Sequence, residues 1–432
     1  MERMQQCLGF RNARTINNAR ALVPAALLAV MLSATACDWF TPHQSPSTPH
    51  EDAAPPSPNP IPEPVSAELT RAPYLQSLGQ TEVSIAFRTQ SAVATTVDYG
   101  RTLDYGTSAT DQSTQIHAVQ LENLTPGTRY FYRVRTGDQT LAGGESFFFD
   151  TDAGPSDPEF SFFVAGDLGD ADGDLAATGW RLLATAPRAE IGLLTGDIVY
   201  PDGAAADYDP NFMRPLAALL RNVAVWPALG NHDWHVDPAQ NFEQEWILPN
   251  NEHYYSFDRG NAHFVALDTQ DGQIYDRTNQ VAWLRADLAA HRNATWTFVY
   301  YHHPGYTCTY KGNDTTVIQY FHPVFDEYGV DVVFEGHAHT YERLYPMRGS
   351  TVVDRDQDPN YVNPGGTIYM IVGCGAKTEG STTPDCDINA VAIDRTVMFA
   401  LATVRGNELT IRIIESGSGR VRDTMTIRKN AV

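Results

Sequence analysis

The stretch IGLLTGDIVY at residues 191–200 indicates the kind of fold that this chain adopts. Its apolar run ends in a glycine turn that presents Asp197, and Tyr200 follows three residues later. An apolar run without alternating polar residues predicts a strand that is buried on both faces. Glycine suits the sharp turn after such a strand, because it has no Cβ to clash. The stretch therefore predicts a buried strand that delivers a carboxylate at its carboxyl end.

Six further apolar runs between residues 160 and 375 repeat this pattern of a strand followed by a turn. They are FSFFVAGD (160–167), VAVWPALGNHD (223–233), HFVALDT (263–269), WTFVYYHHP (296–304), VDVVFEGHAH (330–339) and TIYMIVGCG (367–375). Helix-like stretches lie between the runs, at 173–186, 209–222, 278–291 and 315–329. Strands that alternate with helices predict an α/β domain, which we place at residues 157–430.

Most of these predicted strands end beside a side chain that can donate a lone pair to a cation. In open α/β sheets, ligands bind beyond the carboxyl ends of the strands, so these side chains are expected to meet. Carboxylate, imidazole and amide oxygen together suit Fe, Zn or Mn better than Ca or Cu(I). His303, beside His302, is expected to point away and is left out. The pattern predicts a metal site, whose candidate residues are Asp167, Asp197, Tyr200, Asn231, His232, His302, His337 and His339.

The first 37 residues have the features of a secretory signal. Basic residues precede the apolar run ALVPAALLAVML (21–32), and the small residues SATA come directly before Cys37. The run is too short for a comfortable transmembrane helix. The small residues resemble a bacterial lipoprotein box, although Ala34 stands where such a box usually has Leu. We predict a periplasmic or cell-surface protein, attached to a membrane only through a lipid anchor on Cys37. Ordinary cleavage near Ala36, followed by secretion, is the alternative.

Two segments separate the predicted signal from the α/β domain. Residues 38–66 are dense in Pro, Ser and charge, which is typical of a linker without a packed core. Residues 67–152 contain short runs with strand-like patterns, at 82–89, 95–100, 117–137 and 144–151, separated by Gly and Pro turns. Short strands at regular spacing predict a small β-sandwich.

Charge and cysteine content narrow the class of protein further. The formal net charge is −22, which makes the chain a poor candidate for binding nucleic acid, because such binding needs basic patches. Positive charge for an anionic ligand would then have to be local, and bound metal ions are one way to supply it. Three cysteines follow the predicted signal, in a compartment that favours disulfides. Cys374 and Cys386 flank one loop and are the expected pair; a bridge from Cys308 to either of them stays open.

Five sequence blocks, found in this order, resemble the metallophosphoesterases and specifically the purple acid phosphatases. They are GD (166–167), GDIVY (196–200), GNHD (230–233), YYHHP (300–304) and GHAHTYER (336–343). The resemblance implies a fibronectin type III-like β-sandwich, followed by a calcineurin-like αββα domain with two packed mixed sheets. Tyr200, three residues after Asp197, is the feature that marks the purple acid branch of this family, because a phenolate favours Fe³⁺.

The resemblance also implies an assignment of the ligands and a reaction. Fe³⁺ would take Asp167, Asp197, Tyr200 and His339, and a divalent ion (Zn²⁺, Mn²⁺ or Fe²⁺) would take Asp197, Asn231, His302 and His337. A metal-bound hydroxide would hydrolyse phosphate monoesters of small molecules or macromolecules, with His232 assisting the leaving group. Glu342, in the last block, is expected to pair with Arg343 or another cation and to brace the ligand loop.

One departure from the family pattern and two rival functions remain. The loop after YYHHP reads GYTCTYKGNDTT (305–316) and lacks the further histidines of the plant enzymes, so Tyr306, Tyr310 or Lys311 are candidates for phosphate contact. The first rival function is a phosphodiesterase, or a phosphoesterase directed at phospholipids, on the same metals. The second is a cell-surface binding lipoprotein with residual activity, which predicts missing ligands, yet all seven are present.

Overall fold

A computed structural model describes residues 68–430, apart from 157, 171–173, 237–238, 271–276, 357 and 381–385. The expected signal (1–37) and linker (38–66) lie outside the described residues. Within the described part, no helix has both the length and the apolar character needed to cross a bilayer.

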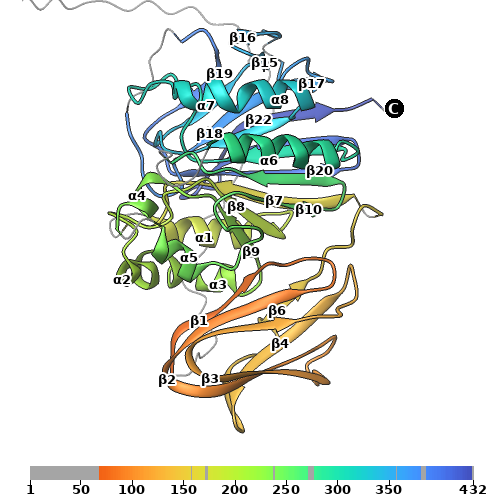
Figure 1. Cartoon of the computed structure of the whole chain (residues 1–432), viewed down its shortest axis with the longest axis vertical. Helices are drawn as coiled ribbons and strands as arrows, with labels where there is room; N and C mark the ends of the chain where they lie inside the picture. The colour runs from red at the N-terminus through yellow and green to blue at the C-terminus, as the bar shows by residue number, and fades with distance from the viewer. Residues whose placement is uncertain are drawn as a thin grey trace, which may run out of the picture. The chain divides into compact units, whose positions relative to one another are not determined.

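Residues 69–150 form the sandwich-like antiparallel sheet that the sequence predicts (Figure 1). The two predicted strands at 82–89 and 95–100 are halves of one long strand, in which the pairing with the next strand shifts between Arg88 and Thr95. Val97, Tyr132 and Phe149 are buried in its core. The strands are β1 (Leu69–Gln76), β2 (Val83–Gly100), β3 (Thr107–Leu121), β4 (Arg129–Thr136), β5 (Gln139–Ala142) and β6 (Phe148–Asp150).

The second part contains two seven-stranded mixed sheets, as the α/β pattern and the resemblance imply. The first has the order β17-β22-β21-β20-β7-β8-β9, and its last three strands are parallel. Its strands are β7 (Glu159–Ala165), β8 (Ile191–Leu194), β9 (Ala224–Pro227), β17 (Asn360–Val362), β20 (Met398–Arg405), β21 (Glu408–Glu415) and β22 (Val421–Arg428).

The second sheet has the order β10-β11-β12-β13-β18-β14-β19, and β11, β12, β13 and β18 run parallel. Its strands are β10 (Tyr255–Arg259), β11 (Ala262–Ala266), β12 (Trp296–Tyr300), β13 (Val332–Glu335), β14 (Tyr341–Leu344), β18 (Ile368–Val372) and β19 (Asn389–Ile393). A small hairpin, β15 (Met347–Arg348) and β16 (Thr351–Val352), accompanies it.

Aromatic side chains hold the two sheets face to face. Phe162 of β7 lies with its ring centroid 5.2 Å from that of Phe264 and 5.1 Å from that of Phe298, which belong to the other sheet. All three side chains are fully buried. Rings at these separations add an attraction to the free energy of burying their apolar area. The core between the sheets therefore fixes how the strand ends of the two sheets meet.

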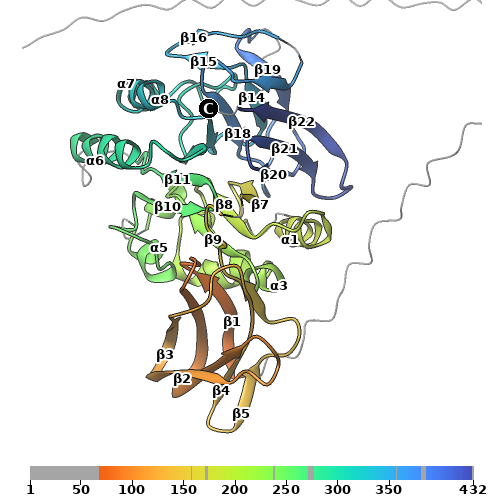
Figure 2. The ribbon, with the colours of Figure 1, turned by 90° about the vertical axis from the view of Figure 1, so that its right-hand side faces the viewer.

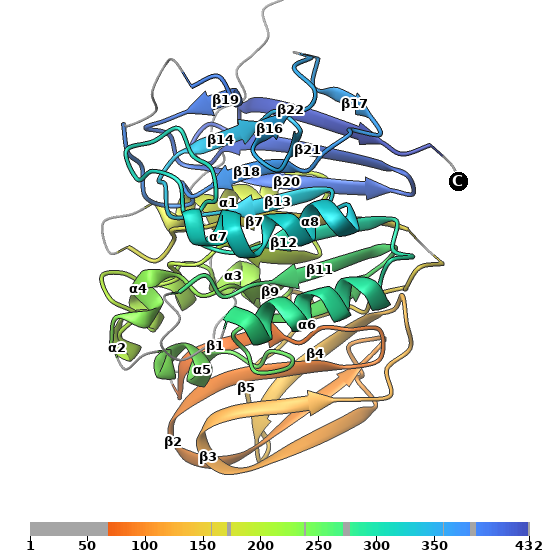
Figure 3. The same cartoon turned by 45° about the horizontal axis from the view of Figure 1, so that its top comes forward.

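Helices lie on the outer faces, with α6 to α8 on one side and α1 and α3 on the other (Figures 2 and 3). The four predicted helical stretches are helical, although 209–222 and 315–329 are each broken into two elements. The helices are α1 (Leu175–Ala184), α2 (Ala205–Asp207), the π-helical η1 (Tyr208–Met213), α3 (Ala217–Leu220), α4 (Asn231–Trp234), α5 (Gln240–Glu245), α6 (Arg277–Ala290), α7 (Thr315–Tyr320) and α8 (His322–Tyr328).

The disulfide differs from the expected pair. Cys308 is bonded to Cys386, and Cys374 is a free, fully buried thiol. Cys374 lies two residues after β18 and continues its buried run, with its thiol 3.9 Å from the carbonyl oxygen of Met398. A side chain fixed in the core cannot reach a loop cysteine, although only eleven residues separate the two in sequence. The disulfide instead ties the loop after β12 to the loop before β19.

Candidate metal centre

Three candidate ligands occupy backbone conformations that side chains other than glycine rarely adopt. Asp167 has φ 57°, Asp197 has φ 49° and His337 has φ 67°. Left-handed conformations cost free energy at such residues and persist where the surrounding structure enforces them. Here each one lies in the turn after a strand, namely β7, β8 and β13. The turns hold one another: Asp167 N donates to Gly196 O (3.1 Å), and Gly166 N donates to Val372 O of the other sheet (2.9 Å).

Glycines next to the ligands allow these turns to touch. A Cβ on Gly230 would lie 2.0 Å from the backbone nitrogen of Asp197, and a Cβ on Gly336 would lie 2.5 Å from Thr195 O. Both distances are far inside van der Waals contact, so only glycine fits at these positions. The glycine in each of these sequence blocks is therefore needed for the approach of the neighbouring turn.

One group of four candidates surrounds the hydroxyl of Tyr200. Its oxygen lies 3.0 Å from Asp167 Oδ1, 2.9 Å from Asp197 Oδ2 and 3.3 Å from His339 Nε2. His339 Nε2 is also 3.2 Å from Asp167 Oδ1. A single phenolic proton can serve only one of these acceptors, so the cluster holds more lone pairs than protons to satisfy them.

The other candidates surround Nε2 of His302. This atom lies 3.1 Å from Asn231 Oδ1 and 3.3 Å from Asp197 Oδ2, while Nδ1 lies 2.9 Å from the carbonyl oxygen of Thr195. If Nδ1–H donates to that carbonyl, Nε2 presents a lone pair toward two oxygens. The ring of His337 lies 5.1 Å from that of His302. Asp197 contacts both groups, and all seven candidate ligands are thus brought together.

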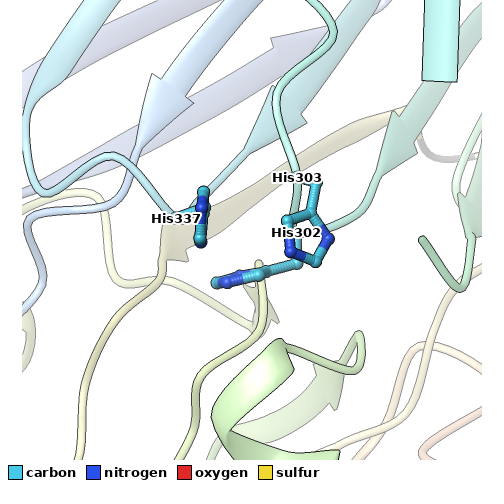
Figure 4. Close-up of side chains that lie close together, drawn as sticks. All are labelled: His302, His303 and His337. Atoms are coloured by element: carbon cyan, nitrogen blue, oxygen red, sulfur yellow. The ribbon is translucent and has the colours of Figure 1, made fainter. Parts of the chain in front are cut away.

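His303 also lies at this site, which the sequence analysis did not expect. The ring centroids of His303 and His337 are 4.6 Å apart, and nitrogens of His302, His303 and His337 lie within 4.8 Å of one another (Figure 4). Nδ1 of His303 is 3.1 Å from Thr269 Oγ1, so its orientation is fixed by the loop after β11. Asp167, Asp197 and His302 form a second close group of possible ligand atoms.

Burial and mutual charge strongly perturb the ionisation of these groups. Burial opposes charge on His302, but Asp197 outweighs it and raises the pKa of His302 to about 9. Burial and the positive charge of His302 lower the pKa of His337 to about 2. Burial and the neighbouring carboxylates Asp167 and Asp197 raise the pKa of Tyr200 far above its usual value. Bound cations stabilise buried carboxylates that lie beside other lone-pair donors. The residues present therefore fit a metal centre.

Comparison with known proteins agrees with this geometry. Residues 70–151 match the family model of the purple acid phosphatase N-terminal domain, and residues 160–341 match that of the calcineurin-like phosphoesterases. The chain belongs to the purple acid phosphatase family. Purple acid phosphatase 21 of Arabidopsis thaliana is 28% identical over 337 residues, covering 71% of each chain. Acid phosphatase type 7 of Danio rerio is 27% identical over 359 residues, covering 73% of this chain and 77% of the relative.

Solved structures show the same fold. The purple acid phosphatase from yellow lupin seeds superposes with a TM-score of 0.70 at 19% identity, over 83% of this chain and 75% of that one. The family match identifies this protein as a metallophosphoesterase. Its sandwich-like N-terminal sheet precedes two packed mixed sheets.

His232, the candidate catalytic residue of this purple acid phosphatase, lies at the edge of the centre. Its backbone nitrogen donates to Asp197 Oδ1 (2.8 Å), its Nδ1 contacts the carbonyl oxygen of Pro201, and its Nε2 lies 3.9 Å from Asp197 Oδ2. Its side chain is 30% exposed, whereas that of Asp197 is buried. His232 can therefore meet a substrate while its backbone positions Asp197.

Sequence reasoning missed two carboxylates that support the ligands. Glu379 Oε1 lies 2.8 Å from Nδ1 of His339, so it orients the ring whose Nε2 faces Tyr200. Asp233 accepts bonds from the backbone nitrogens of Ile198 (2.9 Å) and Gly230 (2.9 Å), and joins the two turns on either side of Asp197. The GNHD block contained a signal for Asp233, but Glu379 lies in a polar loop without any pattern.

The remaining residues of interest lie in the loops around the centre. Nζ of Lys377 is 3.0 Å from Asp170 and 3.7 Å from the centre of the Tyr200 ring, a contact that no sequence pattern indicated. Tyr310 is 68% exposed, and Tyr306 is buried. Glu342 does not pair with Arg343, which instead binds Asp423. The carboxylate of Glu342 accepts hydrogen bonds from Thr307 Oγ1 (2.9 Å), Cys308 N (2.8 Å) and Asn389 Nδ2 (3.0 Å). Glu342 therefore braces the disulfide-linked loop.

Proposed function

We propose that the chain is an exported dinuclear metallophosphatase that hydrolyses phosphate monoesters. The observation that carries the proposal is the convergence of all seven expected ligands into two groups that share Asp197. Relatives named as purple acid phosphatases and acid phosphatases support the substrate class.

The two groups fit two cations of different preference. Asp167, Asp197, Tyr200 and His339 would hold the ferric ion, because a phenolate oxygen and carboxylates are hard donors. Asp197, Asn231, His302 and His337 would hold the divalent ion, Zn²⁺, Mn²⁺ or Fe²⁺, since imidazole and amide oxygen suit it. When bound, the two ions supply positive charge for the phosphoryl oxygens and lower the pKa of a water molecule.

The chain's own residues fix the directions of the lone pairs. The carbonyl of Thr195 holds Nδ1 of His302, and the carboxylate of Glu379 holds Nδ1 of His339, so that both Nε2 atoms face the carboxylates. A ligand ring held in this way loses little freedom when an ion binds. Because Asp197 is anchored by the backbone nitrogen of His232, the two groups keep a fixed separation.

His232 is placed to act on the leaving group. Its Nδ1 is held by the carbonyl oxygen of Pro201, so Nε2 is the nitrogen that faces the site. A proton carried on Nε2 can pass to the leaving oxygen of the ester, which is general-acid assistance. Lys311 supplies further positive charge near His303 and His337, whose pKa values it helps to lower.

Two observations support export. The described part contains the disulfide Cys308–Cys386, and disulfides persist in oxidising compartments. The amino-terminal sequence has the features of a secretory signal, with the lipid anchor on Cys37 as its proposed form. The disulfide also fixes the loop that carries Lys311.

The proposal is tested with the metal-loaded chain and two nitrophenyl substrates. The monoester p-nitrophenyl phosphate should be hydrolysed faster than the bis ester. Asp197→Asn should lower monoester kcat/KM by more than about 100-fold, because even residues that only orient metal ligands contribute 10- to 100-fold. Faster hydrolysis of the bis ester would favour a phosphodiesterase, and full activity of Asp197→Asn would exclude the assigned centre.

A further inference from the structure

A second cluster of histidine and aspartate lies where β10, β11 and the end of α6 meet. His263 of β11 pairs across the strands with Asp258 of β10, and His291 follows α6 directly. His263 pairs in the other direction with Thr297 of β12, five residues before His302. At about 3.3 Å per residue, this places the cluster roughly 16 Å from the metal centre along the strand direction. It is therefore a separate site.

Asp287 of α6 holds one ring nitrogen of each histidine. Its Oδ2 lies 2.7 Å from Nε2 of His263, and its carbonyl oxygen lies 2.8 Å from Nδ1 of His291. The other carboxylate oxygen of Asp287 accepts a hydrogen bond from Ser256 Oγ (2.8 Å), so both of its carboxylate oxygens have a partner. When these two nitrogens carry the protons, Nδ1 of His263 and Nε2 of His291 are left with free lone pairs. Asp287 thus contacts one nitrogen of each ring and leaves the other nitrogen to face Asp258.

The two remaining nitrogens face the same carboxylate. Nδ1 of His263 lies 2.7 Å from Asp258 Oδ1, and Nε2 of His291 lies 3.9 Å from Asp258 Oδ2. Ligand atoms of Asp258, His263 and His291 all lie within 4.8 Å of one another. The 2.7 Å contact between Nδ1 of His263 and Asp258 Oδ1 needs a proton or a metal ion between the two atoms. Carboxylate or carbonyl groups that hold the second nitrogen of each histidine are typical of metal sites.

The exposure of two of the three side chains would also allow an ion to enter the cluster. His263 is buried and fixed, whereas the side chain of Asp258 is 56% exposed and that of His291 is 35% exposed. Both line a surface hollow together with Gly260, Asn261 and Ala294. The rings of His263 and His291 are stacked with centroids 3.9 Å apart, so His291 has to turn to direct its lone pair at a shared ion.

We propose that Asp258, His263 and His291 form a third metal site, for a divalent ion of the zinc class, outside the dinuclear centre. Two imidazoles and one carboxylate are a donor set that zinc uses, with water completing the coordination. The ion would link the β10–β11 hairpin to the end of α6, and it takes no part in the hydrolysis of phosphate esters.

The test counts bound zinc by equilibrium dialysis of the full chain against a range of free Zn²⁺ concentrations up to millimolar. The wild-type chain should bind one equivalent more than His291→Ala and one more than Asp258→Asn. The matched control is Arg292→Ala, which removes an exposed neighbouring side chain and should bind as many equivalents as the wild type. Phosphatase activity should be the same in all four proteins, because none of these residues contacts the dinuclear centre.

Two outcomes distinguish this site from the main one. Equal zinc binding by wild type and both ligand variants at every concentration overturns the proposal, whatever the activity. Loss of zinc together with loss of activity in His291→Ala would also overturn it, because the site would not be independent. Since Asp258 and His291 are exposed, the variants should keep the fold, which circular dichroism confirms.

Discussion

Replacement of Glu379 tests whether the chain orients His339 for a metal ion. Glu379 Oε1 lies 2.8 Å from Nδ1 of His339, and the two side chains are 19% and 14% exposed. Glu379→Gln keeps an oxygen that accepts this bond but removes its charge. A hydrogen bond to a charged group contributes about 1.5–3 kcal/mol, against about 0.5–1.5 kcal/mol for a neutral one. The difference of about 1–1.5 kcal/mol predicts roughly tenfold weaker binding of the ion at His339.

Glu379→Ala removes the bond altogether and should weaken binding by up to about 100-fold. Affinity is measured by competition with a chelator, with monoester kcat/KM followed in parallel. Glu408→Gln is the matched control, because Glu408 is also an ion-paired carboxylate, to Arg428, but lies on β21. If Glu379→Gln and Glu379→Ala retain metal as tightly as Glu408→Gln, the orienting role of Glu379 is wrong.

Two further predictions concern stability. Cys386→Ser should lower the free energy of unfolding by up to about 4 kcal/mol, because the lost disulfide joins residues 78 apart; Cys374→Ser should leave the disulfide intact. Chemical denaturation of both variants checks this, and an unchanged unfolding midpoint for Cys386→Ser would contradict it. Burial disfavours charge on His253, but Asp268 and Glu243 outweigh it and raise its pKa above 6.5. Its stabilising effect is full below pH 6.5 and is lost as the pH rises through the folded pKa. The difference in unfolding free energy between wild type and His253→Gln should therefore shrink with rising pH, and a constant difference would exclude this account.

The grouping of the candidate ligands was predictable because it depends on local pattern. The pattern consists of a buried strand, a glycine and then Asp, Asn or His, and it spans only about ten residues. Parallel strands bring their carboxyl ends to one edge of the sheet. Asp197 and His337 illustrate this: each follows its strand within three residues. The helices were predictable for the same reason, although Pro215 and Pro323 lie near the breaks that divide two of them.

Contacts between distant segments were not predictable from pattern. Glu379 reaches His339 from a polar loop whose sequence has no periodicity, so nothing local marks it. His303 was expected to point away from His302, but β12 ends at Tyr300, so the alternation of side chains along a strand does not apply to these two histidines. Closeness in sequence likewise suggested the wrong cysteine pair, because burial of Cys374 in the core prevents it from reaching the loop.

The third site shows a further limit of sequence reasoning. A lone histidine in a strand or directly after a helix is usually structural, so nothing in the sequence marks His263 or His291 as a ligand. Only the packing of α6 against the β10–β11 hairpin brings Asp258, His263 and His291 together and aligns them on Asp287.

The visible absorption spectrum of the purified protein, taken with its metal content, tests the proposed centre most directly. We expect two metal ions per chain, one of them iron, and a purple or pink charge-transfer band that disappears in Tyr200→Phe. A colourless protein that holds two zinc or manganese ions would contradict the ferric assignment of Asp167, Tyr200 and His339. A chain that binds no metal under any loading condition would contradict the dinuclear mechanism as a whole.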